Sequence, residues 1–220
     1  MMKTKFINCW LSRAKPVSKP YLLFLIISLL FLSCTTEVTF TLQNDDSVNI
    51  TFEGGSGAAF SKMISAAAGA EGDLLIDENS VAYELARSGF SDVKVNQKKG
   101  GAVRITMSDK KQSSYLFTSN LIKKENDSLT AQISAKSLKA FYDSADEQTR
   151  MILDLFLSPV FNDDQMSEAE YLEMLGSFYG KAAADEVQNS TVKLIFKGKT
   201  GKESKITIPL TQFLCGNFNY

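Results

Sequence analysis

Three pairs of segments with alternating apolar and polar residues constrain the fold of this chain most strongly. The apolar positions of the pairs are Val38, Phe40 and Leu42 with Val48, Ile50 and Phe52; Val93 and Val95 with Val103, Ile105 and Met107; and Val192, Leu194 and Phe196 with Ile206, Ile208 and Leu210. Polar turn residues separate the two members of each pair, a pattern that predicts β-hairpins. Because each strand has a single apolar face, we expect an antiparallel sheet that is covered on one side and hydrated on the other.

Helical patterns occupy other parts of the chain. The expected helices lie at 58–68, 80–88 and 137–142, and after two capping-box pairs, Ser144 with Glu147 and Ser167 with Glu170. Gly89 and Phe90 follow the second of these helices, an arrangement typical of a left-handed C-cap. Strands and helices that do not alternate regularly predict an α+β fold, an antiparallel, hairpin-built sheet with helices packed on one face.

The stretch at 113–134 has a weaker pattern. We expect strands at 115–117 and 129–133 around a polar turn at 123–128. Pro209, near the end of the last hairpin, cannot donate a backbone hydrogen bond, so we expect it at a sheet edge or in a bulge.

An uncharged run of 13 residues, at 21–33, ends directly before Cys34. It is shorter than the roughly 20 apolar residues that a membrane-spanning helix needs. Basic residues and no acidic ones stand before it. A basic stretch followed by a short apolar run is typical of a secretory signal segment.

The end of this run, Phe31, Leu32 and Ser33, together with Cys34, resembles the lipobox of bacterial lipoproteins. The common motif has leucine at the place of Phe31 and a small residue at the place of Leu32, so the match is similar to the relaxed lipoboxes of spirochaetal lipoproteins. The resemblance implies that residues 1–33 are cleaved off. It also implies a diacylglycerol thioether on Cys34 and acylation of the new amino end by a fatty acid such as palmitate. An uncleaved signal anchor, with Cys34 uninvolved, is the alternative.

The resemblance implies a division of the chain and a location. Residues 1–33 would be the signal peptide, residues 34–37 the lipidated cysteine and a short tether, and residues 38–220 a single domain. Two or three acyl chains on one cysteine hold a protein stably at a bilayer. We expect the domain outside the cytoplasm, anchored in the cell membrane or the outer membrane; the choice between the two membranes stays open.

Charge and cysteine content narrow the partners of the cleaved protein. Cleavage before Cys34 would remove five of the 24 basic residues and none of the 25 acidic ones, which changes the net charge from −1 to −6. This acidic balance without a basic cluster argues against nucleic acid or an anionic lipid surface as partner. Cys9 would leave with the signal peptide and Cys34 would be lipidated, so Cys215 would stand alone and no intramolecular disulfide could form.

Histidine is absent from the sequence, which excludes Ser-His-Asp and Cys-His catalysis and every zinc site with an imidazole ligand. Cys215 is expected to be a small buried hydrophobe and not a nucleophile. Three short matches spell parts of the serine–lysine motif of penicillin-binding enzymes: Lys199-Thr200-Gly201, Ser91 with Lys94, and Ser108 with Lys111. The S-D-N element is missing and the matches fall in strands and turns, so we expect no catalytic residue, cofactor or metal.

Two further clusters have an ordinary and a functional interpretation. The glycine-rich stretch at 54–57 before a helix could bind an anion, but it fits no phosphate-binding motif and is expected to be a flexible connection. The acidic residues Asp163, Asp164, Glu168, Glu170 and Glu173 could hold calcium. They lack the spacing of an EF-hand loop, and carboxylates in a first helical turn explain them better.

Three hypotheses about function follow. The first is a lipid-anchored, non-catalytic domain that binds a protein partner at the envelope or acts in surface interactions. The second is a carrier of an apolar or lipid-like ligand, in a cavity lined by Phe156, Leu172 and Phe178. The third is a histidine-independent hydrolase, which requires two carboxylates or a serine and a lysine in one cleft.

Overall fold

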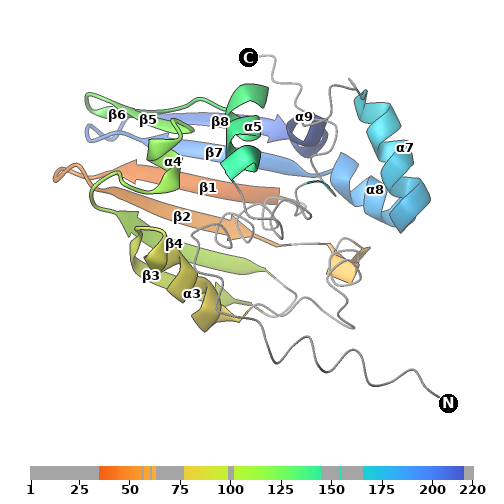
Figure 1. Cartoon of the computed structure of the whole chain (residues 1–220), viewed down its shortest axis with the longest axis horizontal. Coiled ribbons are helices and arrows are strands. Elements are labelled where there is room, and N and C mark those ends of the chain that lie inside the picture. The colour runs from red at the N-terminus through yellow and green to blue at the C-terminus, as the bar shows by residue number, and fades with distance from the viewer. Residues whose placement is uncertain are drawn as a thin grey trace.

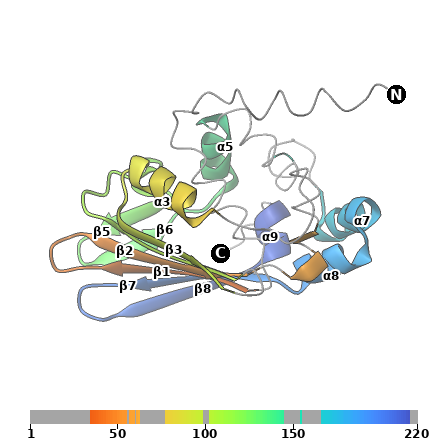
Figure 2. The same cartoon turned by 90° about the horizontal axis from the view of Figure 1, so that it is seen from below.

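A six-stranded sheet forms the centre of the molecule, and helices with a second, two-stranded sheet lie on one side of it (Figures 1 and 2). The computed structural model describes residues 35–55, 57–59, 61–62, 77–98, 102–144, 154 and 166–215. The strands of the large sheet are β1 (Thr35–Leu42), β2 (Val48–Gly54), β3 (Ser91–Gln97), β4 (Val103–Asp109), β7 (Thr191–Lys197) and β8 (Glu203–Pro209), in the order β3-β4-β2-β1-β7-β8. The expected α+β class is confirmed.

The three expected hairpins are present. β1 pairs with β2, β3 with β4 and β7 with β8, each antiparallel. One pairing was not expected: β1 and β7 run parallel and join the first hairpin to the last. Phe40 of β1 stacks on Phe196 of β7 with ring centroids 5.2 Å apart, so the two strands present their apolar residues to the same side. Residues 43–190 connect these strands and leave ample length for a parallel crossover.

The core lies between the sheet and the helices. The buried residues include the inward positions of all six strands and residues of the helical layer. Ile50, Phe52, Leu85, Ile105 and Tyr171 are among the largest side chains with almost no exposure. The apolar residues that alternate along the strands therefore form one packed face of the sheet, as the sequence predicts.

Helix α3 (Glu78–Arg87) begins and ends as its sequence predicts. The Asp77 carboxylate caps its first turn by accepting hydrogen bonds from the backbone of Asn79 and Ser80. At the other end Gly89 has a φ of 96°, and the Phe90 N–H donates to the Leu85 carbonyl at 3.3 Å. Glycine is suited to this left-handed position, and the bond closes a Schellman motif.

Helix α7 (Glu168–Tyr179) carries the predicted capping box. The Ser167 hydroxyl accepts from the Glu170 N–H, and the Glu170 carboxylate accepts from the Ser167 N–H at 2.8 Å. Gly180, with a φ of 89°, then turns the chain into α8 (Lys181–Gln188), and α9 (Leu210–Cys215) follows β8 directly. Neither α8 nor α9 was expected. Leu210, assigned to a strand by its alternation, begins α9.

The stretch at 113–134 differs from the expectation. Its aromatic segment is not a strand but a helical turn, α4 (Tyr115–Thr118), and the hairpin consists of β5 (Ile122–Glu125) and β6 (Ser128–Ala131). The buried Asp109 carboxylate explains the turn, because it accepts hydrogen bonds from the backbone of Lys111, Ser113 and Ser114 and bends the chain there. The expected short helix is present within α5 (Ala135–Ser144).

Both edges of the large sheet carry features that discourage pairing with another strand. Pro209 lies in the edge strand β8, as expected. The Leu210 N–H donates to the Ser190 carbonyl at 2.9 Å, so the adjacent Thr191–Pro209 pair is a non-hydrogen-bonded one and the proline nitrogen faces outward. At the opposite edge β3 has a register shift between Ser91 and Lys94.

The expected tether is wrong in its extent. Thr35 already pairs with Thr191 in the parallel ladder, and Thr36 is fully buried, so the residues assigned to the tether after Cys34 are the start of β1. Strand pairing with β7 fixes these polar residues, which sequence alternation alone does not reveal. The lipobox and Cys34, and also Asp163 and Asp164, lie outside the described residues. Of the helix expected after Glu147 only Asp154 is described, and it is helical; of the stretch at 58–68, residues 58–59 and 61–62 are helical.

Candidate functional site

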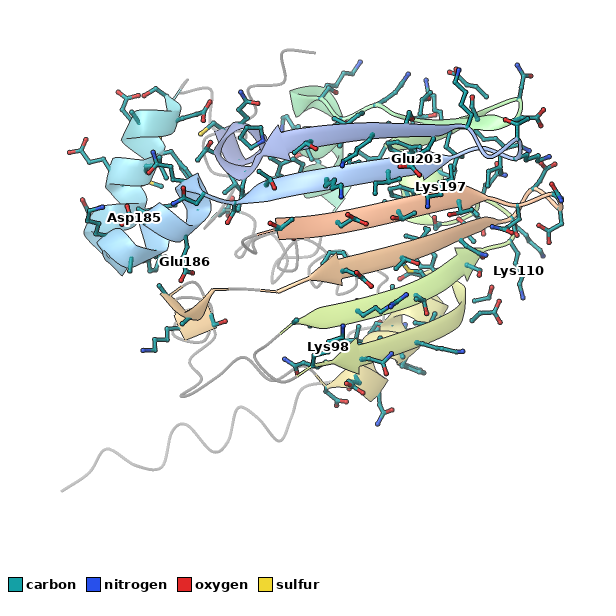
Figure 3. The ribbon with its side chains drawn as sticks, turned by 180° about the vertical axis from the view of Figure 1, so that it is seen from behind. Lys98, Lys110, Asp185, Glu186, Lys197 and Glu203 are labelled. Carbon is teal, nitrogen blue, oxygen red and sulfur yellow. The ribbon has the colours of Figure 1, made fainter. Side chains whose placement is uncertain are left out.

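The side of the large sheet that faces away from the helices forms a polar surface, here called the open face (Figure 3). It consists of the outward positions of the six strands: Thr35, Glu37, Thr39, Thr41, Asn49, Thr51, Glu53, Lys94, Asn96, Arg104, Thr106, Ser108, Thr191, Lys193, Ile195, Lys197, Glu203, Lys205, Thr207 and Pro209. Five are cations and three are anions. The open face is thus more positive than the acidic chain as a whole.

Cross-strand pairs organise the open face. Glu37 binds Lys193 at 2.5 Å, Glu53 binds Arg104 at 3.1 Å, and Lys197 lies 3.5 Å from Glu203. Such neighbours on adjacent strands stabilise a sheet modestly when their charges are opposite. Among the described residues, Lys94 and Lys205 have no carboxylate within ion-pair distance.

Lys205 lies next to a second lysine, Lys193, and its charged form is disfavoured. Its neighbour Lys193 lowers the pKa of Lys205 through direct contact and charge repulsion. The Glu37 carboxylate, first among several causes, raises the pKa of Lys193. An anion that approached this part of the open face would relieve the repulsion at Lys205.

The two ends of the sheet differ in composition. The turn end contains the hairpin turns at 43–47, 126–127 and 198–202. There Asp46 Oδ1 lies 2.6 Å from the Lys124 ammonium nitrogen and 2.5 Å from that of Lys199. Hydrogen bonds from these two lysines lower the pKa of Asp46 to about 2. Asp46 in turn raises the pKa of Lys199. The lysine of the Lys-Thr-Gly match is therefore held protonated, unlike the neutral amine that a general base requires.

The helix end, where β1 and β7 begin, holds α7, α8 and α9 (Figure 1). Tyr171 and Cys215 are buried there, and the Thr211 hydroxyl donates to the Glu168 carboxylate. Burial, and to a smaller degree Glu168, raises the pKa of the Cys215 thiol to about 11. Burial also raises the pKa of Tyr171, with smaller contributions from Cys215 and Tyr179. The prediction that Cys215 is a buried hydrophobe agrees with this environment.

The glycine-rich stretch at 54–57 does precede a helical segment, and an internal carboxylate occupies the helix start. The Ala59 N–H donates to Glu186 Oε1 at 3.0 Å. A Cβ on Gly57 would lie 2.3 Å from the Glu186 carboxyl carbon, so the absence of a side chain admits this carboxylate. The anion that the stretch binds is Glu186 of α8 (Figure 3).

The described members of the acidic cluster serve helix α7. Glu170 completes the capping box and Glu168 accepts from Thr211, while Glu173 lies exposed. Within the described ranges, no three acidic or cysteine side chains gather in a way that could hold a metal ion. Glu168 and Glu170 lie in the first turn of α7, where carboxylates complement the helix dipole.

The residues named in the hypothesis of an apolar-ligand cavity do not share one environment in the described part of the chain. Phe178 is 76% exposed and contacts Tyr179, whereas Leu172 packs on the core; Phe156 lies outside the described residues. Tyr83 on α3 is 63% exposed, with the Arg87 guanidinium 5.7 Å from its ring centre. An exposed tyrosine beside an arginine is a combination enriched at protein interfaces.

The contacts between residues far apart in the sequence were not predicted by the sequence analysis. Glu186 reaches Ala59 across 127 positions, and Lys193 reaches Glu37 across 156. The one local signal was the turn at 43–47, whose aspartates suggested a turn but not an ion-pair partner. Ser91, Lys94, Ser108 and Lys111 lie in or just after β3 and β4, as expected.

Among the described residues, no helix combines the length and apolar character that crossing a bilayer requires.

Similarity to known proteins adds no further assignment. A scan against protein-family models finds no match, and searches of curated proteins and of solved structures find none either.

Proposed function

We propose that this chain is a lipid-anchored envelope protein whose domain, held outside the cytoplasm by acyl chains on Cys34, acts as a non-catalytic binding domain for a protein partner. The observation that carries the proposal is the junction at Cys34, where an uncharged run with a basic leader meets a relaxed lipobox. Among the described residues, strand β1 begins with Thr35, the next residue. Cleavage before Cys34 would leave every strand of the large sheet intact.

The binding role rests on how the polar groups are used. Two of the ionisable groups that the sequence analysis considered are engaged in structural contacts, Lys199 with Asp46 and Glu170 with Ser167. The exposed Tyr83 and its neighbour Arg87 offer the aromatic and guanidinium groups that often dominate binding energy at interfaces. Helix α3, which carries both, lies on the side of the sheet opposite the open face (Figure 2).

Metabolic labelling tests the anchor. Cells that express the full chain are grown with a tritiated or alkyne-tagged palmitate, and we expect label in the wild type and none in Cys34→Ala. Cys215→Ala is the matched control, because it removes the other cysteine of the cleaved protein and should keep the label. Label that persists in Cys34→Ala would refute lipidation at this residue.

Site-specific photo-crosslinking in living cells tests the protein partner. A crosslinking amino acid at position 83 should yield a discrete adduct with an envelope protein. The same group at Thr200, which is exposed in the turn between β7 and β8, is the matched control and should yield none. No adduct at position 83, or the same adduct at both positions, would contradict a binding surface on α3.

A further inference from the structure

The large sheet ends in two edge strands, β3 and β8, and they differ in the backbone groups that they leave unpaired (Figure 1). An edge strand presents N–H and C=O groups to which an extended segment of another chain can be added as a further strand. In an antiparallel pair, successive residues point these groups alternately toward the paired strand and away from it. The hydrogen-bonded positions of each hairpin therefore show which residues point outward.

The edge at β3 is largely blocked. The Lys98 N–H donates to the Ala102 carbonyl at 2.7 Å, so the neighbouring Gln97 points its backbone groups outward. The carboxylate of Glu78, the first residue of α3, accepts from the Gln97 N–H at 2.6 Å. The register shift at the start of β3 interrupts the row of outward groups at the other end. Between these two features lies a single outward residue, Val95, so this edge offers little to a new strand.

The edge at β8 is open over most of its length. The nitrogen of Pro209 faces outward, and every second residue before it points its backbone groups the same way: Thr207, Lys205 and Glu203. In the part of the chain that the structure describes, no hydrogen bond to the outward N–H and C=O groups of these residues is found. Pro209 withholds one donor, at the end of β8 that leads into α9. The outward groups before it form a continuous row.

A strand added to β8 would meet different side chains on its two sides. On the open face it would lie beside Lys205, whose pKa is lowered by contact with Lys193 and which has no carboxylate within ion-pair distance among the described residues. On the covered side it would lie beside Ile206, which packs against the core and is partly exposed. Side chains alternate between the two sides of a strand, and opposite charges on neighbouring strands attract. The edge therefore matches a segment in which acidic and apolar residues alternate.

We propose that β8 binds an extended segment of another protein as an additional antiparallel strand, with an acidic side chain opposite Lys205 and an apolar one beside Ile206. This surface is separate from Tyr83 on α3, and it does not depend on lipidation of Cys34.

A second copy of the chain fits the same edge less well. If β8 paired with β8 of the copy across a two-fold axis, Lys205 would meet Glu203 of the copy only when the strands overlap at 203–205 alone. A longer overlap in the same hydrogen-bonding phase places Lys205 opposite Lys205, Thr207 or Pro209 of the copy, none of which is acidic. Charge complementarity therefore favours an acidic segment of a different protein.

Amide hydrogen exchange tests the strand addition. The full chain in detergent is titrated with an end-capped synthetic peptide in which glutamate and valine alternate, and exchange is followed by NMR. We expect the N–H groups of Lys205 and Thr207 to exchange quickly in the free protein and about tenfold more slowly with excess peptide, while Val95 on β3 is unchanged. Failure of the peptide to slow exchange at Lys205 and Thr207, or equal slowing at Val95, would overturn the proposal.

Two modified peptides separate backbone pairing from charge. N-methylation of the glutamates blocks the N–H groups that face β8 in an antiparallel pair, and it should abolish the slowing. N-methylation of the valines, whose N–H groups face away, is the matched control and should retain it. Lysine in place of glutamate should weaken the slowing. Slowing that survives methylation of the glutamates would show that the peptide does not bind as a strand.

Charge reversal in the protein tests the acidic partner. Lys205→Glu should bind the lysine peptide better than the glutamate peptide, whereas Lys94→Glu, the same change on the open face of β3, should keep the wild-type preference. An unchanged preference in Lys205→Glu would contradict the proposed charge pair.

Exchange in the free protein tests whether the edge is already occupied. Slow exchange at Lys205 and Thr207 that increases with protein concentration would identify a second copy as the occupant. Slow exchange that does not depend on concentration would mean that other residues of the same chain cover the edge. Either result would overturn the proposal.

Discussion

The two ends of the central sheet use electrostatics in opposite ways. At the helix end, polar groups are buried: Tyr171 and Cys215 are enclosed, and Glu186 reaches the start of a helix. At the turn end, Asp46, Lys124 and Lys199 bind one another near the surface. Solvent screens exposed pairs but not enclosed groups, so the helix end should dominate stability. The turn end holds neighbouring hairpin turns together, and its contribution should be small and sensitive to salt.

The largest effect should come from Tyr171→Ala at the helix end. This substitution leaves a cavity beneath α7 and should reduce the free energy of unfolding by about 3–5 kcal/mol, as large-to-small changes of buried aromatic residues do. Urea denaturation measures the loss. Tyr83→Ala, which removes the same side chain from an exposed site, should cost no more than about 1 kcal/mol. A comparable loss for both variants would remove the basis for assigning stability to the helix end.

A second substitution tests whether Glu186 connects α8 to the glycine-rich stretch. Glu186→Ala should lower the free energy of unfolding by about 1–2 kcal/mol, because the Ala59 N–H at the helix start loses its charged acceptor. Glu173→Ala, an exposed carboxylate on α7, is the control and should stay within about 0.5 kcal/mol. Thermal unfolding followed by circular dichroism compares the two variants. An equal and negligible effect would mean that the contact contributes nothing.

The sequence could predict local features and not contacts between distant residues. Strand alternation and helix caps are local, so the three hairpins, the capping box at Ser167 and the C-cap at Gly89 were all identified. The parallel pairing of β1 with β7 was not, because it depends on residues 156 positions apart. Leu210 satisfied a strand pattern although it begins α9. Residues 115–117 satisfied one too, although Asp109 bends the chain before them and they lie in α4.

For the candidate site, the sequence could supply only what a short motif contains. Cys34 and its lipobox are such a motif, and their role stays a prediction. The contacts of Glu186 and of Asp46 required the folded arrangement, because no local pattern links a carboxylate in one element to a backbone amide or a lysine in another.

Alkaline pH should weaken the helix end selectively. The pKa of Cys215 is raised from 9.0 to about 11, so the native state retains the thiol proton after the unfolded chain has lost it. The stability from this group is complete below pH 9 and is lost as the pH rises to about 11. Tyr171, whose pKa is also raised, adds to the loss at higher pH. Denaturation between pH 8 and 11 should show the decline, and Cys215→Ala should make it shallower. The same slope in both proteins would exclude Cys215 as its source.

Acid and salt should act on the turn end, with the smallest effect. The lysines lower the pKa of Asp46 from 3.8 to about 2, so the native state binds the proton later than the unfolded chain does. The stabilisation is therefore complete above about pH 4 and disappears as the pH falls through 2. Asp46→Asn should abolish this step and should lower the melting temperature slightly at low ionic strength, where the ion pairs are least screened. Raising the salt concentration should bring the melting temperatures of the variant and the wild type together.

Asp143→Asn, which removes the partner of Lys139 on α5, controls for the loss of one surface charge. If Asp46→Asn lowered the melting temperature as much as Glu186→Ala, and 0.5 M salt did not reduce the difference, the turn end would be as important as the helix end.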